Sequence, residues 1–231
     1  MSEIGIIGAM EEEVDILKKL FISYEIKKIA GLDFYTGFIK NKNVTIVRSG
    51  IGKVNAAMAT QILISEFHTK IIINTGVAGG IKPDIKIGDI VIASDALEYD
   101  FDVTAFGYEL GIIPRMEDSI FRADEKIIEL VKKAADQDTK NNVFIGRIIS
   151  GDKFVSSKED AKKLGEIFKA YAVEMEGAAI AHVAYLNNVP FAIIRSISDN
   201  ANDEAFVDFD SFVKKAAEAS SNIVEKLIQV M

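Results

Sequence analysis

Short apolar runs alternate with amphipathic stretches along most of this chain. The apolar runs are rich in β-branched residues and are bounded by glycine or polar turns, which is typical of buried strands. We expect strands at residues 4–7, 34–39, 44–47, 71–74, 90–93, 144–150 and 191–196.

Helical periodicity fills three of the intervals between these runs. Apolar residues that recur three or four positions apart place one hydrophobic stripe on each helix. The three stripes are Val14, Leu17, Leu20 and Phe21; Ala56, Ala59, Leu63 and Phe67; and Phe212, Ala216, Ala219, Ile223 and Leu227. Strands alternating with helices predict an α/β sandwich around a largely parallel or mixed sheet.

The composition indicates a single domain with one core. The chain has 231 residues, is 49% hydrophobic and carries a net charge of −8. This is enough apolar material for one core, so we expect a single domain over residues 1–231. The acidic balance without a basic stripe disfavours nucleic acid as a partner.

The sequence contains no pattern typical of a metal site or of a membrane-spanning segment. The chain has no cysteine, and its two histidines, His68 and His182, lie far apart. We therefore expect no metal site and no disulfide. The first residues lack the basic start of a signal peptide, and no apolar run reaches membrane-spanning length, so we expect a soluble cytoplasmic protein.

Residues 172–179 place two carboxylates, Glu174 and Glu176, in a segment that otherwise reads as core. Burying an unpaired carboxylate costs several kcal/mol, so a partner is required. A cation, a group of N–H donors, or a ligand with hydroxyl groups would serve. A ribose 2′,3′-diol offers two donors to one carboxylate, which makes this segment a candidate small-molecule site.

Other candidate groups follow strands. Glu11, Glu12 and Glu13 follow the first strand, where acidic residues also complement a helix N-terminus. Asp199 follows the last strand, where a cap or turn is its ordinary role. Because ligands of open α/β sheets bind beyond the carboxyl ends of strands, Glu13 is a candidate base and Asp199 a candidate acid. Arg195 is a candidate to hold a carboxylate or a water.

Two further segments belong with these candidates. Residues 75–80 are expected to form a glycine-rich turn after a strand, where the backbone could approach a ligand closely, although a plain tight turn is as good an explanation. Residues 98–124 are less periodic and contain Gly107, Gly111 and Pro114. A long irregular excursion in a compact domain usually serves a site or an interface.

Taken in order, these segments resemble the bacterial 5′-methylthioadenosine/S-adenosylhomocysteine nucleosidases of the purine nucleoside phosphorylase superfamily. The resemblance covers nearly the whole chain. It is carried by residues 5–14, 49–54, 74–80, 88–92, 102–108, 150–154, 173–176 and 195–199. It implies a three-layer α/β/α sandwich with a mixed central sheet, no cofactor and a homodimer.

The resemblance also implies roles for individual residues. Glu13 would activate the attacking water, with Arg195 helping to hold it. Asp199 would protonate adenine N7, with Ser198 orienting it. Glu176 would bind the ribose hydroxyls. The remaining implied contacts are Phe154 and Val155 with the adenine, Met175 with sugar and base, Met10, Ile51 and Phe209 with the ribose and 5′-alkylthio group, Gly79 in the pocket wall, and Phe106 and Pro114 with the partner subunit's pocket.

One position departs from the family pattern. Val77 stands where many members carry Ser or Thr, and valine has the shape of threonine without its hydrogen bond. Water positioning would then depend more on Glu13 and Arg195.

Three other functions remain open at this stage. A phosphorolytic relative would need arginines around phosphate, whereas Asn74 occupies the position before the glycine turn and only Arg48 and Arg195 are near. An aminodeoxyfutalosine nucleosidase shares these motifs. A nucleoside-binding module without activity would not need both Glu13 and Asp199.

Overall fold

The computed structural model describes residues 3–138, 141–202 and 205–231. Its strands form one mixed sheet in the order β10-β6-β8-β9-β5-β1-β4-β3-β2, with β7 beside β6. The strands are β1 (Ile4–Gly8), β2 (Tyr24–Ile29), β3 (Leu32–Ile39), β4 (Lys42–Arg48), β5 (Ile71–Gly80), β6 (Ile90–Glu98), β7 (Phe121–Arg122), β8 (Val143–Ser150), β9 (Ala172–Glu174) and β10 (Phe191–Asp199).

The sheet closes on itself at one end. Strand β10 pairs parallel with β5 and antiparallel with β6, so β5, β10, β6, β8 and β9 form a ring. Strands β1, β5 and β10 run parallel, which brings their carboxyl ends to one edge. A bulge between Ile197 and Asp199 of β10 shifts the register against β5, and such a bulge re-aims the side chains that follow it.

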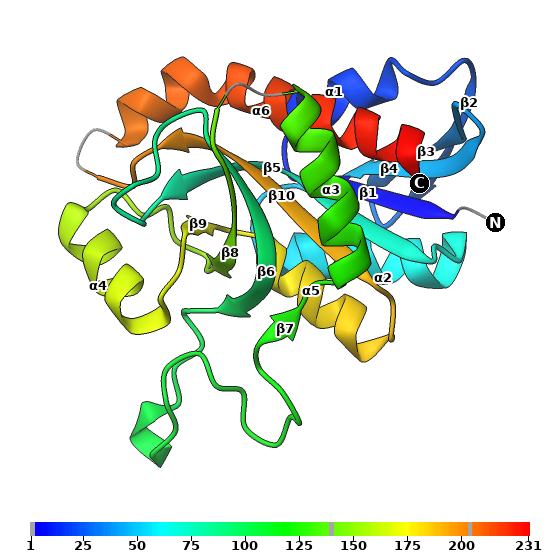
Figure 1. The fold of residues 1–231 in the computed structure, drawn as a ribbon. Coiled ribbons are helices and arrows are strands. Elements are labelled where there is room, and N and C mark those ends of the chain that lie inside the picture. Colours follow the sequence, from blue (N-terminus) through cyan, green and yellow to red (C-terminus); the bar gives the residue numbers. More distant parts are fainter. Residues whose placement is uncertain (1–2, 139–140, 203–204) are drawn as a thin grey trace.

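Helices cover both faces of this sheet, as the sandwich predicts (Figure 1). Helices α2 (Lys53–Phe67) and α5 (Gly177–Leu186) pack together on one face. Helices α1 (Glu11–Lys18), α3 (Glu125–Asp138) and α6 (Ala205–Val230) pack on the other face. Helix α4 (Lys158–Phe168) lies beside β8 and β9 (Figure 1).

Most of the expected elements are present, with differences at their ends. The turn expected at residues 75–80 is wrong: these residues continue strand β5, because their backbone pairs with β10 and β9. The first helix ends at Lys18, so Leu20 and Phe21 lie beyond it, although Phe21 is still buried. The last helix begins at Ala205, and Phe212 on its predicted apolar stripe is exposed. Among the residues described, no helix is long and apolar enough to cross a membrane.

Candidate active site

A cavity of about 490 Å³ opens where the carboxyl ends of β1, β5, β9 and β10 meet. Its wall is largely apolar but holds four carboxylates and, among the described residues, no lysine or arginine. The lining residues are Ala9, Met10, Glu13, Ile51, Val77, Ala78, Gly79, Phe154, Val173, Glu174, Met175, Glu176, Ser198, Asp199, Phe206 and Phe209. An apolar pocket with a few convergent polar groups is typical of a small-molecule site.

Glu13 lies in the first turn of α1 with its side chain 1% exposed. One carboxylate oxygen, Oε2, accepts hydrogen bonds from the backbone N–H of Ala9 at 2.6 Å and of Met10 at 3.0 Å. The other, Oε1, accepts from the backbone N–H of Val77 at 3.1 Å. Burial raises the pKa of Glu13, while the Arg195 charge and these N–H donors act in the opposite direction. A raised pKa brings a carboxylate nearer to the neutral range in which a general base works best.

Arg195 is fully buried behind the cavity and compensates the carboxylates in front of it. Its Nη2 donates to Glu174 Oε2 and, at 2.6 Å, to Asn74 Oδ1. Its guanidinium nitrogens lie 3.9 Å from both Glu13 Oε1 and Glu176 Oε2. One cation therefore hydrogen-bonds Glu174 and lies at ion-pair distance from Glu13 and Glu176, so it compensates the charge of three buried carboxylates.

Gly76 leaves the space in which two of these charged groups meet. It lies in β5, and a methyl group added to it would overlap Arg195 Nη1 and Glu13 Oε1. A residue without a side chain is thus needed here for steric reasons.

Glu176 begins α5 and faces the N-terminus of α2 across the cavity. Its Oε1 accepts from the backbone N–H of Gly52 at 2.8 Å. Burial, followed by the neighbouring Glu174 charge, raises the pKa of Glu176 to about 8. A ligand that donates hydroxyl hydrogens to this group would stabilise its charged form.

Asp199 ends β10 and lines the same cavity as Arg195's carboxylate partners. Its Oδ1 accepts from the backbone N–H of Ala201 at 2.8 Å, and its Oδ2 accepts from Ser198 Oγ at 2.9 Å. Burial raises the pKa of Asp199, and the charge of Asp208 adds to that rise. Asp199 is therefore both a turn residue and a carboxyl group able to hold a proton.

Aromatic side chains close part of the cavity. The Phe154 and Phe209 rings meet edge to face, with centroids 5.8 Å apart. Met10, Ile51 and Met175 supply further apolar wall. Val155 does not line the main cavity. It is buried and lines a neighbouring space of about 30 Å³ together with Phe154 and Asp199.

Known proteins are similar to this chain in sequence and in fold. The family described as the Phosphorylase superfamily matches residues 3–229. The chain is 46% identical, over 97% of its length and 98% of the relative's, to a 5′-methylthioadenosine/S-adenosylhomocysteine nucleosidase of Staphylococcus aureus. The nucleosidase of the same name from Neisseria meningitidis, solved with methylthio-immucillin-A, superposes with a TM-score of 0.96 at 39% identity over all of both chains. The chain belongs to the 5′-methylthioadenosine/S-adenosylhomocysteine nucleosidase family.

A second solved relative has a different name. Futalosine hydrolase of Helicobacter pylori superposes on this nucleosidase with a TM-score of 0.95 at 37% identity, over 100% of this chain and 98% of the other. The family resemblance and the mixed α/β fold that the sequence indicated are thus confirmed.

Two expected pocket residues lie outside the nucleosidase cavity of this single chain. Phe106 ends the short 3-10 helix η1 (Thr104–Phe106) and is 81% exposed, and Pro114 is half-buried further along the same excursion. Figure 1 shows this excursion projecting away from the body of the molecule. Neither residue lines the cavity, so their contribution to a partner's pocket stays a prediction.

Val77 contacts the nucleosidase's candidate base through its main chain. Its backbone N–H donates to Glu13, and its buried side chain packs with Met10, Phe209 and Ala216. The missing hydroxyl therefore does not leave Glu13 without a hydrogen bond from this position.

Two residues of the site received no role from the sequence. Glu174, one of the two carboxylates that first drew attention to its segment, accepts from Ser150 Oγ, Glu176 N and Gly177 N and pairs with Arg195. Its position inside the core segment was the available signal. Phe206 lines the cavity from the first turn of α6, and no local pattern marked it. Across residues 3–138, 141–202 and 205–231, no group of His, Cys, Asp and Glu is arranged to hold a metal ion.

Proposed function

We propose that this chain hydrolyses the N-glycosidic bond of 5′-methylthioadenosine and S-adenosylhomocysteine, releasing adenine and the 5-substituted ribose. Such a reaction serves methionine salvage and the recycling of methylation products. The observation that carries the proposal is one apolar cavity with two separate buried carboxyl groups, Glu13 and Asp199, both with raised pKa values. We assign the whole of residues 1–231 to this one cytoplasmic nucleosidase domain.

The cleavage needs an acid at the leaving group and a base at the attacking water. Asp199 donates its proton to adenine N7, which removes the need to expel an anion, and Ser198 orients the carboxyl group through its hydrogen bond. Glu13 accepts the proton of the water that attacks the anomeric carbon. The sugar becomes oxocarbenium-like in the transition state, and the surrounding carboxylates stabilise its positive charge.

The rest of the cavity positions the nucleoside. Glu176 accepts hydrogen bonds from the ribose hydroxyls, and Arg195 holds Glu13 and Glu174 in place beside the water. Phe154 stacks on the adenine, with the backbone at Phe154 and Val155 at its edge. Met175 packs on sugar and base, while Met10, Ile51 and Phe209 surround the 5′-alkylthio group, and Gly79 lets the backbone approach.

Hydrolysis is favoured over phosphorolysis by the charge of the cavity. Among the described lining residues, a phosphate dianion would meet four carboxylates and no cation. Arg195 is already committed to Glu174 and Asn74, and the exposed Arg48 pairs with Glu11 at 3.4 Å. Phosphate binding in proteins depends on such cations being available.

A second substrate class is aminodeoxyfutalosine, which has the same adenine and ribose. The observation that favours it is the 37% identity to the Helicobacter pylori futalosine hydrolase. Its different 5′ substituent would occupy the end of the cavity that Ile51 and Phe209 line.

We also propose that the enzyme is a homodimer whose partner completes the pocket through Phe106 and Pro114. Support comes from exposed apolar side chains in the described part of the chain: Phe106 at 81%, Val54 on α2 at 79% and Leu186 on α5 at 61%. Exposed apolar groups of this kind are typical of an interface. Sedimentation that shows a fully active monomer would refute the shared pocket.

The direct experiment incubates the protein with 5′-methylthioadenosine, S-adenosylhomocysteine, aminodeoxyfutalosine and adenosine in phosphate-free buffer and measures free adenine. We expect adenine from the two thioethers together with the free 5-substituted ribose. A strict dependence on added phosphate, with a sugar 1-phosphate as product, would overturn the proposal. Rapid release from aminodeoxyfutalosine alone would assign the chain to the second substrate class.

A further inference from the structure

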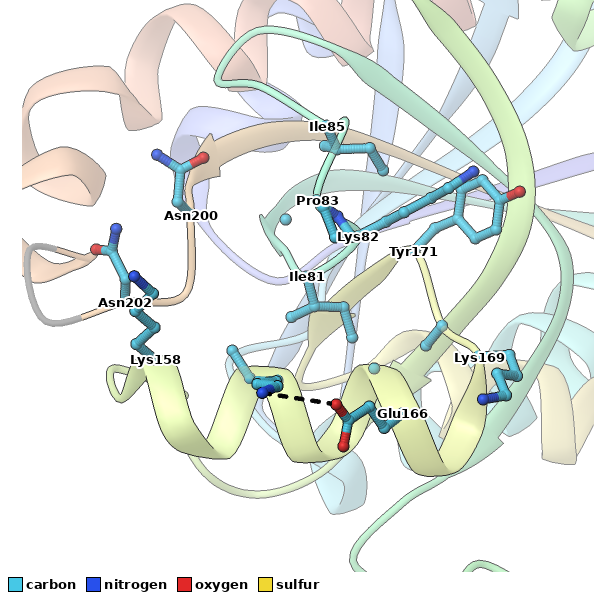
Figure 2. A pocket seen from close by; sticks show the side chains of 15 residues that line it. Ile81, Lys82, Pro83, Ile85, Lys158, Glu166, Lys169, Tyr171, Asn200 and Asn202 are labelled. Atoms are coloured by element: carbon cyan, nitrogen blue, oxygen red, sulfur yellow. Dashed lines mark ion pairs between the residues drawn. The ribbon is translucent and has the colours of Figure 1, made fainter.

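A second cavity, of about 800 Å³, lies next to the end of β10, where Asn200 and Asn202 line it. Its walls are the segment that follows β5, the helix α4 with the residues after it, and the turn that follows β10. Figure 2 shows Lys82, Tyr171, Asn200 and Asn202 around the opening, with α4 forming its floor. None of the catalytic carboxylates lines this space, so it is distinct from the candidate active site.

This basic cleft concentrates positive charge in a chain whose net charge is −8. Of the residues that the structure describes, four lysines line it (Lys82, Lys158, Lys162 and Lys169), together with one carboxylate, that of Glu166. That carboxylate lies 3.9 Å from Lys162, and both side chains are largely exposed, so the pair neutralises little charge. No carboxylate in the described ranges lies within ion-pair distance of Lys82, Lys158 or Lys169.

The lysines stand around a partly apolar interior. Ile81, Ile85 and Ala161 line the wall, and the Lys82 Nζ lies 4.0 Å from the centroid of the Tyr171 ring. The cation–π contact holds the ammonium group at the edge of the cleft. Asn200 and Asn202 add amide groups at the opposite rim (Figure 2).

We propose that the basic cleft is a second binding site, for a small organic phosphate. The unpaired ammonium groups match a multiply charged anion, since lysine binds phosphate as a point charge. The apolar wall fits the carbon skeleton that carries the phosphate, and the volume is that of an ordinary ligand pocket.

The cleft and the catalytic cavity share a thin wall. Gly79 lines the catalytic cavity and Gly80 the cleft, and Asp199 and Asn200 are divided in the same way. Ala201, between Asn200 and Asn202, supplies the N–H that binds Asp199. Because the two spaces are so close, a binding experiment has to separate them with a ligand for the first.

Phenyl phosphate is a suitable probe, since it joins one dianionic group to one apolar ring and contains no nucleoside. We expect it to bind in a 1:1 ratio in titration calorimetry at low ionic strength, with adenine present at saturation. Benzyl alcohol, which has no charge, and inorganic phosphate, which has no apolar part, should both bind more weakly. Equal binding of all three would overturn the proposal.

Two matched double variants locate the site. Lys158→Gln with Lys169→Gln removes two charges from the cleft, and Lys126→Gln with Lys133→Gln removes two exposed charges from α3. We expect the first pair to weaken phenyl phosphate binding about tenfold or more and the second to leave it nearly unchanged. Equal losses of binding in the two double variants would show that phenyl phosphate responds only to the net charge of the protein. Loss of phenyl phosphate binding when adenine is added would place the probe in the catalytic cavity. Either result would overturn the proposal.

Discussion

Glu13 and Asp199 are two buried carboxyl groups of one cavity, yet their surroundings differ. Glu13 receives three backbone N–H donors and faces the Arg195 guanidinium at 3.9 Å. Asp199 accepts hydrogen bonds from one backbone N–H and one hydroxyl, and the charge that acts on its pKa is the negative charge of Asp208. Burial raises both pKa values, and hydrogen-bond donors oppose that rise at both groups, but only Glu13 also has a neighbouring cation, Arg195, that favours its charged form.

Different surroundings therefore suit two chemically similar groups of one cavity to opposite roles, one as a base and one as an acid. A carboxylate held beside a cation and three donors is suited to accept a proton. A carboxyl group without a cation is suited to carry one, as pairs of carboxyl groups in other enzymes are. The base and acid roles proposed above follow from this contrast.

The largest effect should come from removing the base. Glu13→Gln keeps the shape of the side chain but cannot accept the water's proton, so the rate of adenine release should fall ~10²–10⁴-fold. Steady-state kinetics with 5′-methylthioadenosine measure this loss. Glu12→Gln is the matched control, because Glu12 is the exposed neighbour on the same turn, and it should behave like the wild type. Similar losses in both variants would assign the effect to the helix N-terminus.

A backbone change should break the contrast without touching a charged residue. Gly76→Ala places a methyl group against both Arg195 and Glu13, so the two must separate. We expect overpacking to cost about 1–3 kcal/mol of unfolding free energy and the rate to fall about 100-fold or less. Gly165→Ala on α4 is the control, because its added methyl would meet its nearest atom only at 3.5 Å. An unchanged rate in Gly76→Ala would mean that the Glu13–Arg195 geometry is not needed.

Glu176 should contribute to recognition more than to bond breaking. In Glu176→Gln the amide offers one acceptor oxygen and no charge, so ribosides should lose about tenfold in kcat/KM. The 2′-deoxy analogues should lose less, since they make one hydrogen bond fewer to this group. Kinetics with both substrate series provide the test, and equal factors for the two would show that Glu176 does not bind the diol.

The same residue should also make the stability of the protein depend on pH. The pKa of Glu176 rises from 4.5 to about 8 on folding, so between these pH values the folded protein holds a proton that the unfolded chain releases. The unfolding free energy should therefore fall by up to a few kcal/mol as pH rises from 4.5 through 8, and the contribution is complete below 4.5. Denaturant titrations should show a shallower fall in Glu176→Gln. Identical slopes would contradict the raised pKa.

Much of the fold could be read from the sequence because the strands that surround the site are strongly apolar. Strands β1, β5 and β10 are buried along almost their whole length, so periodicity found them. Strand β2 is mostly exposed, and β9 is three residues long, so neither gives such a signal. The closure of the sheet depends on pairings between distant segments, such as β10 with β6, which no local pattern specifies.

Part of the candidate site could likewise be predicted from the sequence. Glu13, Glu176 and Asp199 stand out because a carboxylate beside apolar residues at a strand or helix end needs a partner. Arg195 forms ion pairs with Glu174, Glu13 and Glu176, and Gly76 leaves space for it beside Glu13. These contacts arise only when β5, β9 and β10 lie together. Phe206 on α6 likewise reaches the cavity through the packing of a distant helix.

The most direct test of the two carboxyl roles is the rate of Asp199→Asn on two leaving groups. Adenine needs a proton to depart, whereas p-nitrophenolate, from a p-nitrophenyl riboside, does not. We expect Asp199→Asn to slow adenine release by ~10²–10⁴ and p-nitrophenolate release far less, while Glu13→Gln slows both. Asp210→Asn, an exposed change on α6, and thermal melts control for folding. Equal losses of Asp199→Asn on both substrates would make Asp199 a turn residue only, and would contradict the account.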